Sequence, residues 1–131
     1  MTTHELLLAA KAAAPALAWL GSEDKNAAIL RMADAIVRET DVILAANEAD
    51  VQAAKDTISD VMLDRLRLTP ARIEGISASL EELALLADPL GGGEVWRRPN
   101  GLEIKRVHVP LGVIAIIYES RPNVTADAAM R

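Results

Sequence analysis

The feature that most constrains the fold is the apolar run VIAII at residues 113–117. A short and continuously apolar run is typical of a strand that is covered on both faces, as in a parallel sheet. A parallel strand needs neighbours, and each neighbour arrives through a crossover connection of about a dozen residues or more. No second run of this kind precedes it. The strand, the polar turn and the helical pattern that follows therefore predict the first βα unit of a larger fold of the nucleotide-binding type.

The first 88 residues are typical of successive helices with an aliphatic core, because 51% of the chain is hydrophobic and only 2% is aromatic. The expected helices cover residues 3–20, a segment capped by Ser22, about 41–54, a short segment capped by Ser59, and a segment from Thr69-Pro70 to Asp88-Pro89. Pro15 is expected to kink or split the first helix. The last helix is expected to bury one apolar stripe, formed by Ile73, Ile76, Leu80, Leu83 and Ala87.

The pattern changes at the three glycines 91–93, which are expected to form a flexible connector. A phosphate-binding loop is disfavoured there, because no strand precedes the glycines and no Gly-Lys-Ser/Thr sequence follows them. Residues 99–101, Pro-Asn-Gly, lie between two strand-like runs and predict a β-hairpin. The hydrophobic alternation changes face within the second run, which predicts a bulge near Lys105 and Arg106. The expected organisation is thus a helical region at 1–90, a connector and hairpin at 91–110, and the start of a nucleotide-binding domain at 111–131.

Charge and composition exclude several classes of function. The net charge is −5, and the six basic residues after position 91 do not form the clustered basic face that nucleic acid requires. The chain has no cysteine, no apolar segment long enough to span a membrane, and no basic region before its first apolar stretch. Neither histidine has companions at metal-ligand spacing, so no metal site is expected. A cytoplasmic protein without nucleic-acid or membrane partners is predicted.

The best candidate site is the turn at residues 118–123, Tyr-Glu-Ser-Arg-Pro-Asn. Ligands of open α/β folds bind at the carboxyl ends of strands, beside the N-termini of helices. An ordinary turn explains the same residues equally well, since Arg-Pro-Asn is good turn chemistry and Asn123 could cap the following helix.

Residues 98–129, RPNGLEIKRVHVPLGVIAIIYESRPNVTADAA, closely resemble the γ-glutamyl phosphate reductases (glutamate-5-semialdehyde dehydrogenases) of the aldehyde dehydrogenase superfamily. The particular signature is PLGVIxxIYESRPNVTxDAA, which is present at 110–129. The stretches ILAANEADVQAAK, SDVMLDRLRLTPARIEGIS and LADPLG also resemble this family. The resemblance therefore covers essentially the whole chain, as the N-terminal portion of such an enzyme.

The resemblance implies an α/β fold of the aldehyde dehydrogenase type, of which this chain supplies helices, a hairpin and the first strand of a parallel nucleotide-binding sheet. It implies reduction of γ-glutamyl phosphate with NADPH to glutamate 5-semialdehyde and phosphate, in proline biosynthesis. In this family a cysteine thiolate displaces phosphate and forms a thioester, which hydride then reduces. Because this chain has no cysteine, it is expected to be inactive alone. The hairpin resembles the oligomerisation strands of the superfamily, so the full-length protein is expected to be a homo-oligomer.

The resemblance also assigns roles within the turn. Asn123 is the candidate catalytic residue, as an amide donor to the developing oxyanion. Glu119, Ser120, Arg121 and Pro122 are expected to line the cofactor, and Arg121 is also a possible phosphate contact.

Two other functions compete with this interpretation. A self-contained, non-catalytic helical interaction module could dimerise through the hairpin, but its VIAII strand would then have an unpaired edge and a tendency to aggregate. A different member of the aldehyde dehydrogenase superfamily is disfavoured by the sequence YESRPNVT.

Overall fold

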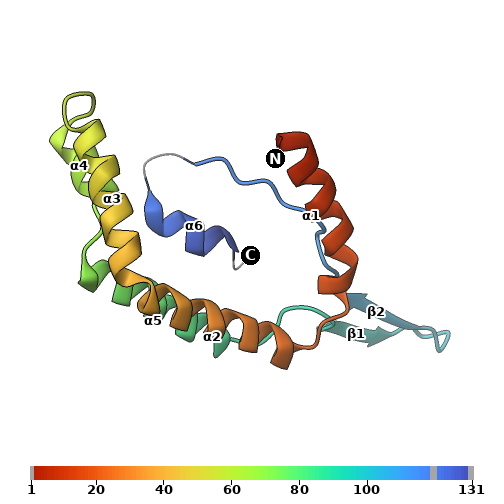
Figure 1. Cartoon of the computed structure of the whole chain (residues 1–131). Coiled ribbons are helices and arrows are strands. Elements are labelled where there is room, and N and C mark those ends of the chain that lie inside the picture. Colours follow the sequence, from red (N-terminus) through yellow and green to blue (C-terminus); the bar gives the residue numbers. More distant parts are fainter. Residues whose placement is uncertain (1, 119–120, 130–131) are drawn as a thin grey trace. The chain divides into compact units, whose positions relative to one another are not determined.

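The computed structural model describes residues 2–118 and 121–129 (Figure 1). Its elements are α1 (Thr3–Ala18), α2 (Ser22–Arg38), α3 (Thr40–Ala54), α4 (Asp60–Leu66), α5 (Pro70–Ala84), β1 (Gly93–Arg97), β2 (Glu103–Val107) and α6 (Pro122–Ala129). The elements form two compact units. The hairpin unit contains α1, β1 and β2, in residues up to Ser22 together with Ala87–Ala115. The helical unit contains Glu23–Leu86 and the residues from Ile116 onward.

The core of the helical unit is built from small and aliphatic residues. The buried residues are Ala33, Asn47, Val51, Ile73, Ser77, Leu80, Ala84 and Ala126. They come from α2, α3, α5 and α6, and α5 contributes half of them. Helix α5 contacts both α3 and α6, and the Ser77 hydroxyl donates a hydrogen bond to the Ala33 carbonyl of α2 at 3.4 Å. Helix α5 is therefore the central element around which the unit packs.

Helix α5 begins where the sequence predicts. The Thr69 hydroxyl accepts a hydrogen bond from the Arg72 backbone N–H at 3.2 Å, and proline occupies the first helical position. The end of the helix was predicted wrongly, because the helix stops at Ala84 and leaves Ala87 outside. The buried stripe is also narrower than predicted, since Ile76 and Leu83 are only half-buried.

The hairpin forms as predicted, but its irregularity lies elsewhere. Strands β1 and β2 pair one to one from Gly93 opposite Val107 to Arg97 opposite Glu103, so the bulge predicted near Lys105 and Arg106 is absent. Beyond the last pair, the Gly91 N–H donates to the His108 carbonyl while the His108 N–H donates to Gly92. Two residues therefore face one at this end, which is the arrangement of a bulge.

The glycines are part of this hairpin rather than a loose connector. Gly91 has a φ of +75°, a left-handed conformation that glycine adopts without strain. A Cβ on Gly93 would lie 1.6 Å from the Arg106 carbonyl oxygen, so only glycine fits at this position. At the other end, Gly101 (φ +85°) closes the tight turn, in which the Gly101 N–H donates to the Arg98 carbonyl at 2.9 Å.

The strand predicted at residues 113–117 is absent from the described part of the chain. Residues 108–118 have no regular secondary structure, and their side chains are all exposed. The sheet in the described residues is the β1–β2 pair, which is antiparallel. A strand requires a hydrogen-bonded neighbour, and this run has none among the described residues, so the parallel sheet stays a prediction.

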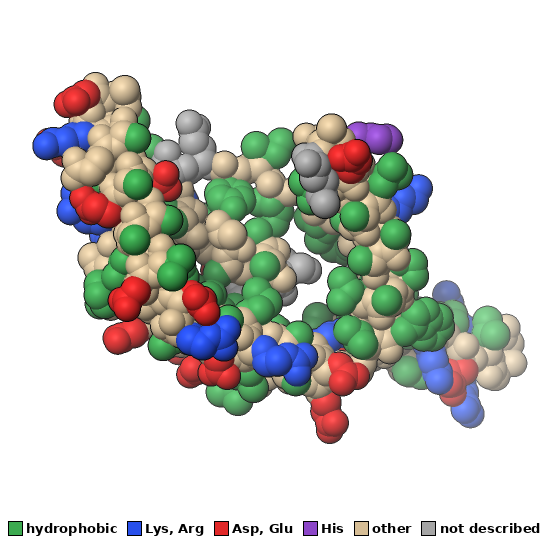
Figure 2. All heavy atoms as spheres, in the orientation of Figure 1, with side chains coloured by type: hydrophobic (Ala, Val, Ile, Leu, Met, Phe, Trp, Pro, Cys, Tyr) green, Lys and Arg blue, Asp and Glu red, His purple; other side chains and the backbone are tan. Residues whose placement is uncertain are grey.

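Helix α1 continues through Pro15 and is not split. It begins with a capping box, in which the Thr2 and Glu5 side chains each bond to the other residue's backbone N–H. No residue of α1 is buried, and Figure 2 shows hydrophobic side chains over its visible face. Ser22, predicted as the cap of α2, is instead its first residue, and its hydroxyl bonds to Asp88 at 3.0 Å. None of the helices in the described residues is long and apolar enough to cross a membrane.

Candidate active site

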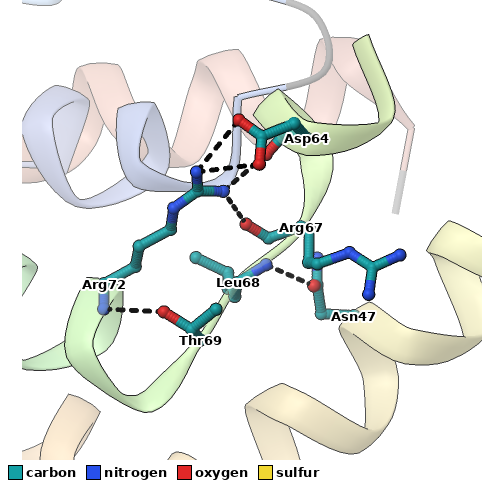
Figure 3. A network of polar contacts seen from close by, with 6 residues as sticks. All are labelled: Asn47, Asp64, Arg67, Leu68, Thr69 and Arg72. Atoms are coloured by element: carbon teal, nitrogen blue, oxygen red, sulfur yellow. Dashed lines mark hydrogen bonds and ion pairs between the residues drawn. The ribbon is translucent and has the colours of Figure 1, made fainter. Parts of the chain in front are cut away.

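The turn between α4 and α5 is fixed by Arg72 (Figure 3). One guanidinium nitrogen of Arg72 donates to the backbone carbonyls of Asp64 and Arg67. The other lies 3.1 Å from both carboxylate oxygens of Asp64. A planar guanidinium bound to a carboxylate and two carbonyls restrains both the end of α4 and the residues that follow it.

Asn47 fixes the same turn from α3. Its side chain is buried, donates to the Leu66 carbonyl at 2.8 Å and accepts from the Leu68 N–H at 2.6 Å. Neither of these backbone groups is hydrogen-bonded within a helix. The Asn47 side chain therefore supplies the hydrogen bonds that the turn cannot make by itself. Figure 3 shows the bond between Asn47 and Leu68 together with the Arg72 contacts to Asp64 and Arg67.

The candidate turn leads into α6, which begins at Pro122. Asn123 is therefore the second residue of the helix, and the prediction that it could cap the helix is wrong. The Tyr118 hydroxyl lies 2.7 Å from the Thr125 hydroxyl, so the chain before the turn is bonded to the first turns of α6. The Asn123 side chain is exposed near the helix N-terminus, where backbone N–H groups and the helix dipole favour negative charge.

An open cleft of about 430 Å³ lies in the helical unit, between the α4–α5 turn, α5 and α6. One wall contains Arg65, Arg67 and Arg72, and the other contains Pro122, Asn123 and Asp127. Asp127 follows Asn123 by four residues, which places both on one face of α6. The cleft thus combines the Arg65 and Arg72 guanidinium groups, the Asn123 amide and the Asp64 and Asp127 carboxylates, which together suit a zwitterionic small molecule. The Arg67 side chain extends away from Arg72 and Asp64, so Arg67 borders the cleft through its backbone (Figure 3).

The cleft brings together part of the predicted site and adds residues that were not predicted. Asn123 and Pro122 line it, whereas Arg121 is exposed and is not among the lining residues. Glu119 and Ser120 lie outside the described residues. Sequence reasoning missed Arg65, Arg67, Arg72 and Asp127 as site residues. The signal for the first three was the density of arginine around a strong helix start, in DRLRLTPAR. In the described part of the chain, no three His, Asp or Glu side chains gather to hold a metal ion.

Comparison with solved structures first gives the class of protein. The fold matches a *Thermotoga maritima* structure with a TM-score of 0.86 and 37% identity, covering 92% of this chain and 30% of the other. It also matches a *Saccharomyces cerevisiae* structure with a TM-score of 0.90 and 28% identity, covering 99% of this chain and 34% of the other. Both structures are reductases of a phosphorylated compound, and this chain has the fold of one segment of them.

The particular reductase in both cases is γ-glutamyl phosphate reductase. Curated proteins of that name are 53% identical over 97% of this chain in *Koribacter versatilis* and 55% identical over 92% in *Moorella thermoacetica*. The chain spans 31% and 29% of the lengths of these two relatives. No protein-family model matches the chain. By sequence and fold, the chain corresponds to the N-terminal portion of the γ-glutamyl phosphate reductases, as the resemblance of residues 98–129 predicted.

Proposed function

We propose that this chain is the N-terminal part of an NADPH-dependent reductase that converts γ-glutamyl phosphate to glutamate 5-semialdehyde and phosphate in proline biosynthesis. The observation that supports this most strongly is about 50% identity to curated γ-glutamyl phosphate reductases over nearly the whole chain. NADPH would supply the hydride when bound. Arg121 is exposed at the N-terminus of α6, a location whose charge suits a phosphate of the cofactor or the substrate.

Asn123 is the proposed oxyanion donor. Asn123 lies in the first turn of α6 and lines the cleft. The cleft therefore has an amide N–H donor beside the positive end of a helix dipole. A fixed donor at the site where negative charge develops on the carbonyl oxygen lowers the barrier without further reorganisation. Glu119 to Pro122 are proposed to line the cofactor.

The exposed run at 113–117 is proposed to be the first strand of a parallel sheet of the aldehyde dehydrogenase type. The exposure of apolar side chains such as Ile114 (49%) and Ile117 (100%) supports this, since a continuously apolar run requires cover on both faces. The domain boundaries near residues 90 and 110 are part of the same proposal.

The hairpin is proposed to meet another subunit in a homo-oligomer. Trp96 lies directly opposite Ile104 in the β1–β2 register and is 42% exposed. An aromatic residue beside an aliphatic one on an exposed strand pair is typical of a contact surface.

The nucleophile of this chemistry is a cysteine thiolate, and the 131 residues contain no cysteine. We therefore expect the chain alone not to turn over substrate. Reduction of NADP⁺ in the presence of glutamate 5-semialdehyde and phosphate, the reaction run in reverse, measures this directly.

The test of the Asn123 role is Asn123→Ala in the intact enzyme that contains this chain. We expect kcat to fall by about 10²–10³-fold, which is typical for the loss of one oxyanion donor. Asn26→Ala on α2 is the matched control, because Asn26 is not among the residues of the cleft. An unchanged kcat for Asn123→Ala would remove this residue from the mechanism.

A further inference from the structure

We propose that the cleft binds the α-amino acid end of the substrate, with Arg65 on the α-carboxylate and Asp127 on the α-ammonium group. The inference rests on the proposed function, because it takes γ-glutamyl phosphate as the ligand. It adds the part of the substrate that this segment recognises and the residues that recognise it.

Two charges of the cleft, those of Arg72 and Asp64, already neutralise each other. The Arg72 guanidinium is bound to the Asp64 carboxylate at 3.1 Å and to two backbone carbonyls. This pair is therefore part of the frame of the cleft. The side chains of Arg65, Arg67 and Asp127, in contrast, have no hydrogen bond or ion pair within the residues the structure describes.

The backbone that carries Arg65 is held in place by the neighbouring turn. Arg65 lies in the last turn of α4, and Arg67 follows directly in the turn that Asn47 and Arg72 fix. Because two helices hold this turn, its backbone is already fixed before a ligand binds. Less conformational entropy is therefore lost on binding. Guanidinium groups are the side chains best matched to a carboxylate, because they can donate two parallel hydrogen bonds.

The spacing of residues along α6 matches the length of a glutamyl group. Asp127 and Asn123 are four residues apart, which corresponds to a rise of about 6 Å on one helix face. In a glutamyl group the α-carbon and the reacting carbonyl carbon are joined by three carbon–carbon bonds of about 1.5 Å each. An ammonium group on Asp127 therefore places the reacting carbonyl within reach of the Asn123 amide.

Asp127 also decides which end of the substrate enters. A half-buried carboxylate repels a phosphate dianion, whereas it attracts an ammonium group. A phosphate in this cleft would meet that repulsion, but a zwitterionic amino acid group satisfies both walls. The amino acid end is thus the better occupant.

The reverse reaction tests this, because glutamate 5-semialdehyde and phosphate are then separate substrates. In the intact enzyme, we expect Arg65→Met to raise the KM for the semialdehyde by roughly 10- to 100-fold, the loss expected for a charged hydrogen bond. The KM for phosphate and kcat should stay within about threefold. Arg38→Met is the matched control, because Arg38 is an exposed arginine at the end of α2. Arg65→Lys keeps the charge without the planar guanidinium, so its KM for the semialdehyde should be intermediate and its thermal unfolding unchanged.

Asp127→Asn tests the ammonium contact with 5-oxopentanoate, the analogue that lacks the amino group. Wild-type enzyme should have a higher kcat/KM for the semialdehyde than for this analogue. In Asp127→Asn, the ratio of the two kcat/KM values should be about tenfold smaller. A raised KM for phosphate alone, or a semialdehyde KM unchanged in both Arg65 variants, would overturn the inference. If the wild-type enzyme does not reduce NADP⁺ with semialdehyde and phosphate, the proposed function fails as well, so the two failures are distinguishable.

Discussion

The two units of this chain differ in how their apolar residues are covered. All eight buried residues among the described positions belong to the helical unit, where Ile73 is 1% and Leu80 0% exposed. The hairpin unit buries none of its described residues, and in it Trp19 is 90% and Leu111 88% exposed. Both units nevertheless have well-formed local structure, including a capping box, a tight turn and a paired hairpin.

Local sequence signals and a packed core are therefore separate properties of this chain. In the hairpin unit, the helix cap and the tight turn form where the sequence has their signals. Each contributes only about 1 kcal/mol to stability. The helical unit also buries aliphatic side chains, which contribute about 1.5–3 kcal/mol for each fully buried residue. The stability of the chain is therefore concentrated in the helical unit, while the hairpin unit presents apolar surface.

The largest expected effect separates a buried from an exposed leucine. Leu80→Ala should lower the free energy of unfolding by about 2–5 kcal/mol, because it leaves a cavity in the core of the helical unit. Chemical denaturation followed by circular dichroism measures this change. Leu111→Ala is the matched control in the hairpin unit, and we expect it to change stability by less than about 0.5 kcal/mol. Equal effects of the two substitutions would contradict the difference between the units.

The next effect concerns the buried Asn47. Asn47→Ala should lower the free energy of unfolding by about 1–3 kcal/mol, because the Leu66 carbonyl and the Leu68 N–H both lose their hydrogen-bond partner. Gln52→Ala on the same helix is the control, since Gln52 bonds only to the exposed Glu48 side chain at 2.6 Å. The same denaturation experiment applies, and a loss no larger than that of Gln52→Ala would show that the turn does not depend on Asn47.

Much of the fold could be predicted because its signals are local. Thr69-Pro70 predicts the start of α5, and Pro-Asn-Gly at 99–101 predicts the hairpin turn, since each involves residues that are neighbours in sequence. The state of residues 113–117 could not be predicted, because a strand depends on distant partners. The displaced bulge has the same origin, since the alternation in one strand does not reveal which residues of the other strand face it.

Of the two walls of the cleft, the sequence predicted residues only of the wall formed by α6. Pro122 and Asn123 follow a recognisable turn, so the sequence indicates them directly. Arg65 and Arg67 lie more than fifty residues earlier, and only the packing of α5 against α6 brings the cleft walls together. Sequence spacing shows that arginines are dense there, but it does not show which residues they face.

A third prediction alters the hairpin unit alone. Gly93→Ala should abolish the regular β1–β2 pairing, because its Cβ would overlap the Arg106 carbonyl. Cross-strand NMR contacts between β1 and β2 should disappear, while the denaturation midpoint of the helical unit stays unchanged. Gly21→Ala is the control, because a Cβ there meets no atom within 4 Å. Persistence of the cross-strand contacts in Gly93→Ala would mean that the hairpin end is not packed as described.

The smallest expected effect has the opposite sign. Gly75→Ala in α5 should raise the free energy of unfolding by about 0.5–1 kcal/mol, because alanine loses less backbone entropy in a helix than glycine. A Cβ at this position meets no atom within 4 Å. A decrease in stability in chemical denaturation would show that the surface of α5 near Gly75 is more crowded than the structure has it.

Amide hydrogen exchange along the chain tests the central difference between the units most directly. We expect amides of α5, including those of Ile73 and Leu80, to be protected up to the global free energy of unfolding. Amides of α1 should exchange through local opening at close to unprotected rates, since no residue of that helix is buried. Equal protection of α1 and α5 would show that the two units do not differ in this way.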